Sequence, residues 1–271
     1  MADSLFAIVF PTSCSLCHRE MIHASSVDIC PACWDQIESW TGAACAQCGL
    51  PFPSERATDS VLALCPQCRE GEFEFDRARS YGLYAGNLRA VILQLKFRRR
   101  ERLGGRLGGF LQTPWNSLVK ALVDLPILIP VPLHASRKRE RGFNQSELLA
   151  LGLSRKLAKD SAAGGPRVET HCLHRTRPTP PQTGLSIQAR KENVRNVFAV
   201  DKPDRIQGRT VVLVDDVMTT GATLSAGARA LKKAGALSVL GLTLAHATPH
   251  FPDQDTAALR ESIDDTTREW T

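Results

Sequence analysis

The sequence predicts an α/β protein in which a mainly parallel sheet forms the core and a small cysteine-rich domain precedes it. Eight of the nine cysteines fall between residues 14 and 68, and beyond them β-branched or apolar runs alternate with stretches of helical periodicity. Such alternation is typical of parallel strands joined by helices that cover both faces of the sheet. We expect domain limits of 1–72 for the cysteine-rich domain, 73–250 for the main domain and 251–271 for a polar tail.

Periodicity assigns the elements of the main domain in chain order. Helices are expected where apolar residues recur every three or four positions, and strands where β-branched or apolar residues run continuously up to proline, glycine or polar residues. Asn144 or Ser146 opens the longest helix, with Glu147 in its first turn. A glycine-rich stretch at 104–109 is expected to precede a further helical run. The strands are expected at 73–84, 126–132, 168–173, 197–200, 210–214 and 237–245. The helices are expected at 87–97, from the end of the glycine-rich stretch through 123, at 144–159 and at 222–234.

The composition of the 271-residue chain excludes several classes of protein. Its residues are 43% hydrophobic and 23% charged, which rules out collagen, a coiled coil and wholesale disorder. No apolar run reaches the roughly 18 residues of a membrane helix, and the N-terminal apolar stretch follows an acid rather than a base, unlike a secretory signal. The net charge of +6 is compatible with phosphate-rich ligands. We therefore expect a soluble, cytoplasmic protein with no membrane span.

The clustered cysteines form four C-x2-C pairs. One such turn directs two thiolates at one point, and two turns close a tetrahedral shell of four sulfurs, which is the geometry of structural zinc. The spacing favours zinc over an iron–sulfur cluster or a thiol redox role. We expect two structural Zn2+, held by the first two pairs and by the last two, although pairing first with third and second with fourth also fits. The expected ligands are Cys14, Cys17, Cys30, Cys33, Cys45, Cys48, Cys65 and Cys68.

The sharpest motif is VVLVDDVMTTGATL at 211–224, where a buried strand ends in two acids and a loop of small residues leads into a helix. Ligands of open α/β sheets collect at the carboxyl ends of the strands. Hydroxyls and backbone N–H groups at the helix N-terminus can cradle a phosphate, and Asp215 and Asp216 can accept hydrogen bonds from sugar hydroxyls. The motif predicts a ribose 5-phosphate site whose phosphate-binding residues are Thr219, Thr220, Gly221, Ala222 and Thr223.

Two other phosphate-binding motifs are absent from the sequence. There is no G-x4-G-K-[ST], which excludes a nucleotide-hydrolysing P-loop, and no G-x-G-x-x-G, which excludes a dinucleotide fingerprint. An ordinary strand–turn–helix with a capping residue would explain one acid and one threonine of the motif. It would not explain two acids and three threonines.

This motif resembles the 5-phosphoribosyl-1-pyrophosphate (PRPP) signature of type I phosphoribosyltransferases. Over residues 5 to about 246 the chain is similar to the ComF/GntX family, which is named for competence and DNA utilization. Besides the cysteine pairs, the resemblance lies in YAGNLRAVILQLKFRRR (84–100), PVPLHASRKRERGFNQSELLA (130–150) and RTRPTPPQTGLSIQARKENVRNVF (175–198). It implies a type I phosphoribosyltransferase-like core with an N-terminal double zinc ribbon, PRPP as the ligand, and a role in DNA uptake or nucleotide metabolism.

Basic residues indicate where the pyrophosphate group of PRPP would lie. Displacing pyrophosphate from the ribose C1 builds negative charge on the leaving group, which cationic side chains and Mg2+ can stabilise. Arg137 and Arg139 follow the strand at 126–132, where type I enzymes hold pyrophosphate, and Arg175 and Arg177 lie in a loop placed like the hood that closes over the substrate. We expect these four arginines to act in catalysis, with Mg2+ bound together with PRPP.

Two functions of different classes fit these residues. The first is a phosphoribosyltransferase, whose acceptor is not assigned because the residues beyond Ala245 contain no base-reading set. The second is a non-catalytic, PRPP-sensing or single-stranded-DNA-handling component of DNA uptake, with DNA-uptake proteins as partners. The basic runs suit a polyanion, although aromatic residues for stacking are scarce at 6%. The run at 96–102 fits a solvated surface as well as a binding site, and we expect residues 98–100 to bind polynucleotide but not PRPP.

Overall fold

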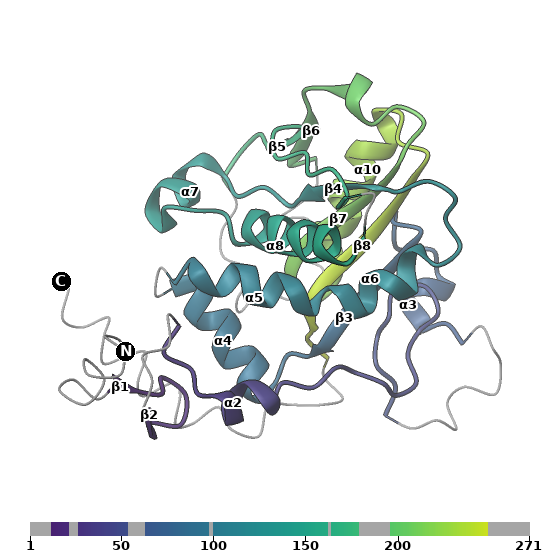
Figure 1. Cartoon of the computed structure of the whole chain (residues 1–271). Helices are drawn as coiled ribbons and strands as arrows, with labels where there is room; N and C mark the ends of the chain where they lie inside the picture. Colours follow the sequence, from purple (N-terminus) through teal and green to yellow (C-terminus); the bar gives the residue numbers. More distant parts are fainter. Residues whose placement is uncertain are drawn as a thin grey trace.

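The computed structural model describes residues 12–21, 27–53, 63–97, 100–161, 164–178 and 196–248. The expected polar tail, Arg98, Arg99 and most of the loop at 175–190, which we call the hood loop, therefore lie outside the described residues. A four-stranded sheet with the order β3-β8-β7-β4 forms the centre of the molecule (Figure 1). All three pairs of neighbouring strands are parallel, which confirms the predicted sheet. The strands are β3 (Arg77–Leu83), β4 (Ile127–Pro130), β7 (Thr210–Met218) and β8 (Ser238–His246).

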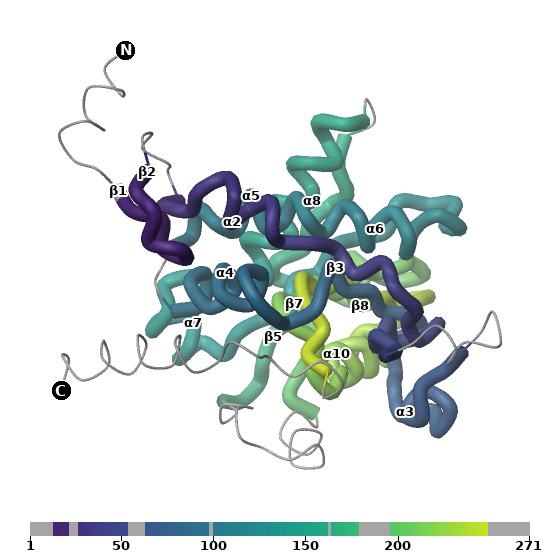
Figure 2. The backbone as a smooth tube through the Cα atoms, turned by 90° about the horizontal axis from the view of Figure 1, so that it is seen from below, coloured from purple at the N-terminus to yellow at the C-terminus, as the bar shows by residue number. Residues whose placement is uncertain are grey.

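Helices cover both faces of the sheet (Figures 1 and 2). Because side chains alternate along a strand, Val212 and Val214 of β7 join one core, whereas Val211 and Leu213 join the other. We call the face of the sheet that carries Val212 and Val214 the α8 face, and the face that carries Val211 and Leu213 the α10 face. The α8 face carries α4 (Gly86–Phe97), α5 (Arg102–Phe110), α6 (Gln112–Val119) and α8 (Gln145–Asp160), and the α10 face carries α10 (Ala222–Lys233).

The remaining elements are short. Residues 168–173 do not form the single strand expected from the sequence: Val168 makes one isolated bridge to Leu128, and a separate strand begins at Leu173. That strand pairs antiparallel with the segment on the far side of the hood loop. No helix among the described residues is long and apolar enough to span a membrane. The short elements are β1 (Thr12–Ser13), β2 (Glu20–Met21), α2 (Pro31–Asp35), α3 (Pro66–Arg69), α7 (Ala135–Arg141), β5 (Leu173–Arg175), β6 (Phe198–Val200) and η2 (Pro203–Arg205).

The glycine-rich stretch at 104–109 is helical, contrary to the expectation that it would precede the next helix. It lies within α5, where a Cβ on Gly108 would fall 2.6 Å from the carbonyl oxygen of Leu149 in α8. From the other side, a Cβ on Gly152 would fall 2.9 Å from the carbonyl oxygen of Gly104. The glycines let the backbones of α5 and α8 approach closely, and this packing outweighs the low helix propensity of glycine.

The two cysteine-rich segments pack on opposite faces of the sheet. Cys14, Cys30 and Cys33 belong to the core of the α8 face, together with Trp34 and the apolar residues of α4 and α5. The four cysteines between residues 45 and 68 belong to the core of the α10 face. Each ribbon therefore shares its buried surface with the main domain, since neither segment is long enough to bury a core of its own.

Candidate functional site

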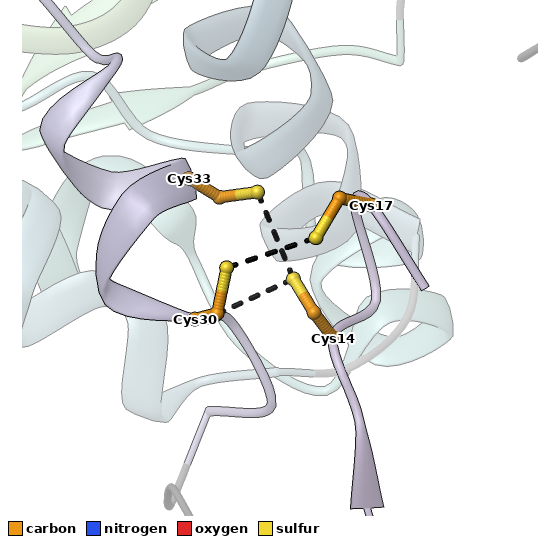
Figure 3. A group of neighbouring side chains, drawn as sticks. All are labelled: Cys14, Cys17, Cys30 and Cys33. Atoms are coloured by element: carbon orange, nitrogen blue, oxygen red, sulfur yellow. Dashed lines mark hydrogen bonds between the residues drawn. The ribbon is translucent and has the colours of Figure 1, made fainter. Parts of the chain in front are cut away.

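The first ribbon gathers four sulfurs around one point (Figure 3). Cys14 Sγ lies 3.8 Å from Cys33 Sγ, and Cys17 Sγ lies 3.7 Å from Cys30 Sγ. All four sulfurs lie within 4.8 Å of one another. The first C-x2-C pair therefore combines with the second.

The second ribbon repeats this arrangement with the last two pairs. Cys45 Sγ lies 3.5 Å from Cys68 Sγ, and Cys48 Sγ lies 3.6 Å from Cys65 Sγ. The sequential pairing of the C-x2-C turns is thus confirmed and the cross-braced alternative is wrong. The reason is spatial, since the two groups lie on opposite faces of the sheet.

Both groups fit a closed shell of structural zinc. Four thiolates at 2.3 Å from a tetrahedral zinc ion lie about 3.8 Å from one another, close to the separations in both ribbons. Backbone N–H groups support the sulfurs: Cys30 N donates to Cys14 Sγ at 3.3 Å, and Cys65 N donates to Cys45 Sγ at 3.3 Å. The hydrogen bond to Cys45 and burial raise the pKa of Cys48. The four buried thiols of the second ribbon require a cation before all of them can ionise.

A pair of buried carboxylates lies near the C-terminal end of β7. Asp215 and Asp216 are 9% and 4% exposed, because β7 continues beyond Val214, where the sequence predicted its end. Asp215 Oδ1 accepts hydrogen bonds from Ser146 Oγ and from the N–H of Asp216, both at 2.9 Å. Ser146 lies in the first turn of α8, and of the two residues predicted to open this helix, Asn144 is the one that caps it. Burial and the neighbouring Asp216 charge raise the pKa of Asp215 to about 7.

Lys96, in the last turn of α4, completes this buried charge cluster. Its Nζ lies 2.7 Å from Asp216 Oδ2. Burial by itself lowers the pKa of the ammonium, but the attraction and hydrogen bond of Asp216 outweigh it, so that the pKa of Lys96 is raised. At neutral pH the site therefore holds a lysine cation against the acid pair.

Two residues of the basic run at 96–102, Lys96 and Arg100, lie in different surroundings. Arg100 Nη1 donates to Ser15 Oγ and to the carbonyl oxygen of Val27, both at 3.2 Å, and Arg100 Nη2 lies 3.4 Å from a carboxylate oxygen of Asp28. Arg100 thus ties the first ribbon to the segment after α4, whereas Lys96 enters the acid pair. Arg98 and Arg99 lie outside the described residues, so polynucleotide binding by residues 98–100 stays a prediction.

The loop after β7 enters α10 through a glycine with a required conformation. Gly221 has φ of +71° and caps α10. A Cβ at this position would lie 2.8 Å from Phe73 Cε1 and 2.9 Å from Met218 Cε, so both the backbone and the space exclude a side chain. Thr220 Oγ1 accepts a hydrogen bond from the N–H of Ala222 at 3.4 Å. The N-terminus of the 12-residue helix α10, which carries a partial positive charge, thus lies a few residues after Asp215 and Asp216.

The four predicted arginines are placed differently from one another. Arg175 on β5 is half-buried, and burial lowers its pKa, while the charges of Asp215, Arg137 and Arg177 also act on it. Its guanidinium lies 5.1 Å from the ring centroid of Phe198. Arg137 and Arg139 lie on the helix α7 rather than in the loop expected after β4. Arg139 and Arg177 are exposed, and within the described part of the chain we find no contact that joins Arg139 to the acid pair.

Two contacts of the acid pair were missed by sequence reasoning. Lys96 follows the apolar residues Leu88 and Ile92 at intervals of four and so shares their helix face, a spacing that could have predicted that Lys96 points toward the core. For Ser146 no such signal exists, since its contact with Asp215 depends on where α8 docks.

Comparison with known proteins supports both parts of the chain. Residues 5–69 match the double zinc ribbon domain, and residues 146–265 match the phosphoribosyl transferase domain. The DNA utilization protein YhgH of Escherichia coli strain CFT073 is 36% identical over 86% of this chain and 96% of its own length. Competence protein F of Haemophilus influenzae is 31% identical over 84% of this chain and 95% of its own. Competence protein ComFC of Bacillus subtilis is 28% identical over 80% and 83%.

The alignments with these relatives cover 80–86% of the chain. The acid pair, the loop through Gly221 and the two four-cysteine groups all lie inside the regions that the two domain families match. This chain belongs to the ComF/YhgH family, in which a double zinc ribbon precedes a phosphoribosyltransferase-like domain.

Proposed function

We propose that the carboxyl edge of the sheet binds PRPP, with the 5-phosphate on Thr219–Thr223 and the ribose hydroxyls on the acid pair. The observation that carries this proposal is the burial of Asp215 and Asp216, 9% and 4% exposed, just before a glycine-entered helix N-terminus. Burying two adjacent carboxylates is costly, and a structural strand-to-helix turn does not need it. A sugar phosphate offers hydroxyl donors to the acids and an anion to the helix.

The hydrogen bonds already present indicate which acid has capacity for a ligand. Asp215 Oδ1 accepts two hydrogen bonds from the protein, while Oδ2 has no hydrogen-bond donor among the described residues. Asp216 Oδ1 accepts a hydrogen bond from the N–H of Val217 at 2.8 Å, and its buried Oδ2 is held in the ion pair with Lys96. We therefore assign the stronger ribose contact to Asp215. Its own supports, Ser146 and the Asp216 N–H, hold the carboxylate in place.

The arginines near Asp215 would serve the leaving group. In phosphoribosyl transfer the bond from the ribose C1 to the pyrophosphate oxygen breaks, and a bond from C1 to the acceptor forms. Arg137, Arg175 and Arg177 would donate to the pyrophosphate as its charge grows. Mg2+ prefers oxygen ligands and commonly enters a site on substrate phosphates. We assign it to the oxygens of PRPP itself, where its charge would stabilise the departing pyrophosphate.

We further propose that this chain acts in the utilization or uptake of DNA, which the names of its relatives describe for those proteins. Single-stranded DNA and uptake proteins would then be its partners. Several described basic residues are already paired within the chain, among them Arg100 with Asp28 and Lys138 with Glu147 at 3.5 Å. We therefore place the ligand-binding activity in the phosphoribosyl site rather than in these basic residues.

Calorimetry with PRPP, with and without Mg2+, tests the proposal. We expect one site per chain and tighter binding with Mg2+. Release of pyrophosphate is then measured against a panel of nucleobases and amines, and release with one acceptor identifies a transferase. PRPP binding without release for any acceptor supports a PRPP sensor. The absence of PRPP binding by folded, zinc-loaded protein would overturn the proposal.

A further inference from the structure

Lys96 reaches the acid pair from the face opposite to the phosphate loop. The helix α4 packs in the core of the α8 face, whereas α10, which begins at the loop through Gly221, packs in the core of the other face. The Lys96 side chain is 19% exposed, and its Nζ lies 2.7 Å from Asp216 Oδ2. A ligand with its phosphate at α10 and its sugar on the acids therefore meets Lys96 beyond the sugar.

The ammonium has donors that its contact with Asp216 does not use. A lysine ammonium carries three N–H donors, and Asp216 is its one ion-pair partner among the residues that the structure describes. A buried charge is costly unless its hydrogen-bonding capacity is satisfied. Since the side chain retains some exposure at the ligand edge of the sheet, the remaining donors are available to an oxygen from outside the protein.

The end of α7 meets the end of α4 at the same place (Figure 2). The Arg141 guanidinium lies 5.5 Å from the ring centroid of Phe97, the residue next to Lys96. Burial lowers the pKa of Arg141, and the Asp216 carboxylate opposes this shift. The helix α7 directly follows the loop after β4, where we place the pyrophosphate. Lys96 and Arg141 thus bring two cations to the pyrophosphate side of the acid pair.

We propose that Lys96 binds the pyrophosphate group of PRPP and that Asp216 holds its ammonium in position. This inference rests on the proposed function and adds a selection rule, namely that the site distinguishes PRPP from ribose 5-phosphate through Lys96. Two ionised acids alone would repel the pyrophosphate, and the lysine offsets one of these charges. If Lys96 were only the counter-ion of Asp216, its removal would weaken the binding of every ligand of the acid pair equally.

The variant Lys96→Met tests this proposal by calorimetry with PRPP and with ribose 5-phosphate. We expect PRPP affinity to fall at least tenfold, the loss typical of one charge-assisted hydrogen bond, while ribose 5-phosphate affinity stays within about threefold. The matched control is Lys156→Met on α8, where the lysine is exposed and lies 2.9 Å from the Asp160 carboxylate. The control should bind both ligands like the wild type.

Lys96→Met leaves the Asp216 carboxylate buried without its cation, which can unfold the protein. A second pair of variants therefore removes this charge. Asp216→Asn is compared with Asp216→Asn/Lys96→Met, and we expect a further tenfold loss of PRPP affinity in the double variant. If Lys96→Met has no effect on PRPP in either background, or if ribose 5-phosphate weakens as much as PRPP, the proposal is overturned while the PRPP site stands. If the wild type binds no PRPP, the proposed function itself fails and the assignment of Lys96 falls with it.

Discussion

The ring of Phe73 lies against Gly221, so that a Cβ on the glycine would come within 2.8 Å of Phe73 Cε1. Phe73 stacks on Phe75 with 4.8 Å between ring centroids, and Phe75 is 1% exposed. The N–H of Glu74 donates to Ser225 Oγ in α10 at 3.0 Å. The segment between the second ribbon and β3 thus supports the loop on which we place the 5-phosphate.

The substitution Gly221→Ala should destabilise the protein and weaken phosphate binding at this loop. The left-handed backbone costs a residue with a Cβ about 1–2 kcal/mol, and contact with Phe73 adds to it. We expect a lower melting temperature and weaker PRPP binding by calorimetry. The control is Gly105→Ala in α5, where a Cβ meets nothing within 4 Å and should leave stability equal or higher. A Gly221→Ala variant with wild-type stability and affinity would contradict the φ of +71°.

Phe73→Ala should weaken PRPP binding without loss of zinc. The ring is half-buried against the loop, so its removal should cost about 1–3 kcal/mol of folding free energy and loosen the turn at Gly221. Zinc content and PRPP affinity are measured on the same preparation. A variant that keeps its zinc and binds PRPP like the wild type would show that the loop holds its shape without this support.

Loss of the second zinc site should destabilise the sheet as well as the ribbon. Cys65 is 1% exposed and lies in the same core as Leu213 of β7 and Leu231 of α10. We expect about two zinc ions per wild-type chain by elemental analysis, and Cys65→Ser should lower the melting temperature of the whole protein. Iron in place of zinc, less than one zinc per chain, or an unchanged melting transition in the variant would each contradict this.

Asp215→Asn should stabilise the fold above pH 7. The pKa of Asp215 is raised from 3.8 to about 7, first by burial and then by Asp216. Between these values the unfolded chain releases a proton that the folded chain keeps, so the wild type loses stability as pH rises through this window. Asparagine does not titrate, and its Oδ1 can still accept from Ser146.

The check is urea unfolding of both proteins at pH 4 and pH 8. The two stabilities should be nearly equal at pH 4, and the variant should be more stable by about 1 kcal/mol or more at pH 8. Asp124→Asn, at an exposed position before β4, serves as the control and should leave the pH profile unchanged. A variant less stable than the wild type at pH 8 would show that the carboxylate stabilises the fold.

Asp215→Asn should weaken PRPP binding, although it should stabilise the fold above pH 7. A carboxylate accepting a ribose hydroxyl contributes about 1.5–3 kcal/mol, so Asp215→Asn should lower PRPP affinity by about tenfold to a hundredfold. Titration calorimetry at pH 8 measures the loss while the variant is fully folded. Equal affinities would remove the ribose contact from Asp215.

The sequence by itself determined the parallel sheet, the eight cysteine ligands and the motif at 211–224, because each depends on spacing along the chain. Strand periodicity, C-x2-C turns and a strand–loop–helix signature are local patterns, and local backbone geometry carries them into the fold. The sequence left the pairing of the cysteine turns open, and it assigned helix α7 to a loop.

Tertiary structure alone decided which side chains meet at the sheet edge. Ser146 contacts Asp215 across 69 positions because α8 docks beside β7, and Lys96 reaches Asp216 because α4 ends at the same edge. The ribbons pair sequentially because they bury against opposite faces of the sheet. The helix at 104–109 likewise forms because α5 and α8 pack backbone to backbone. Such contacts depend on packing between distant segments, which no local pattern encodes.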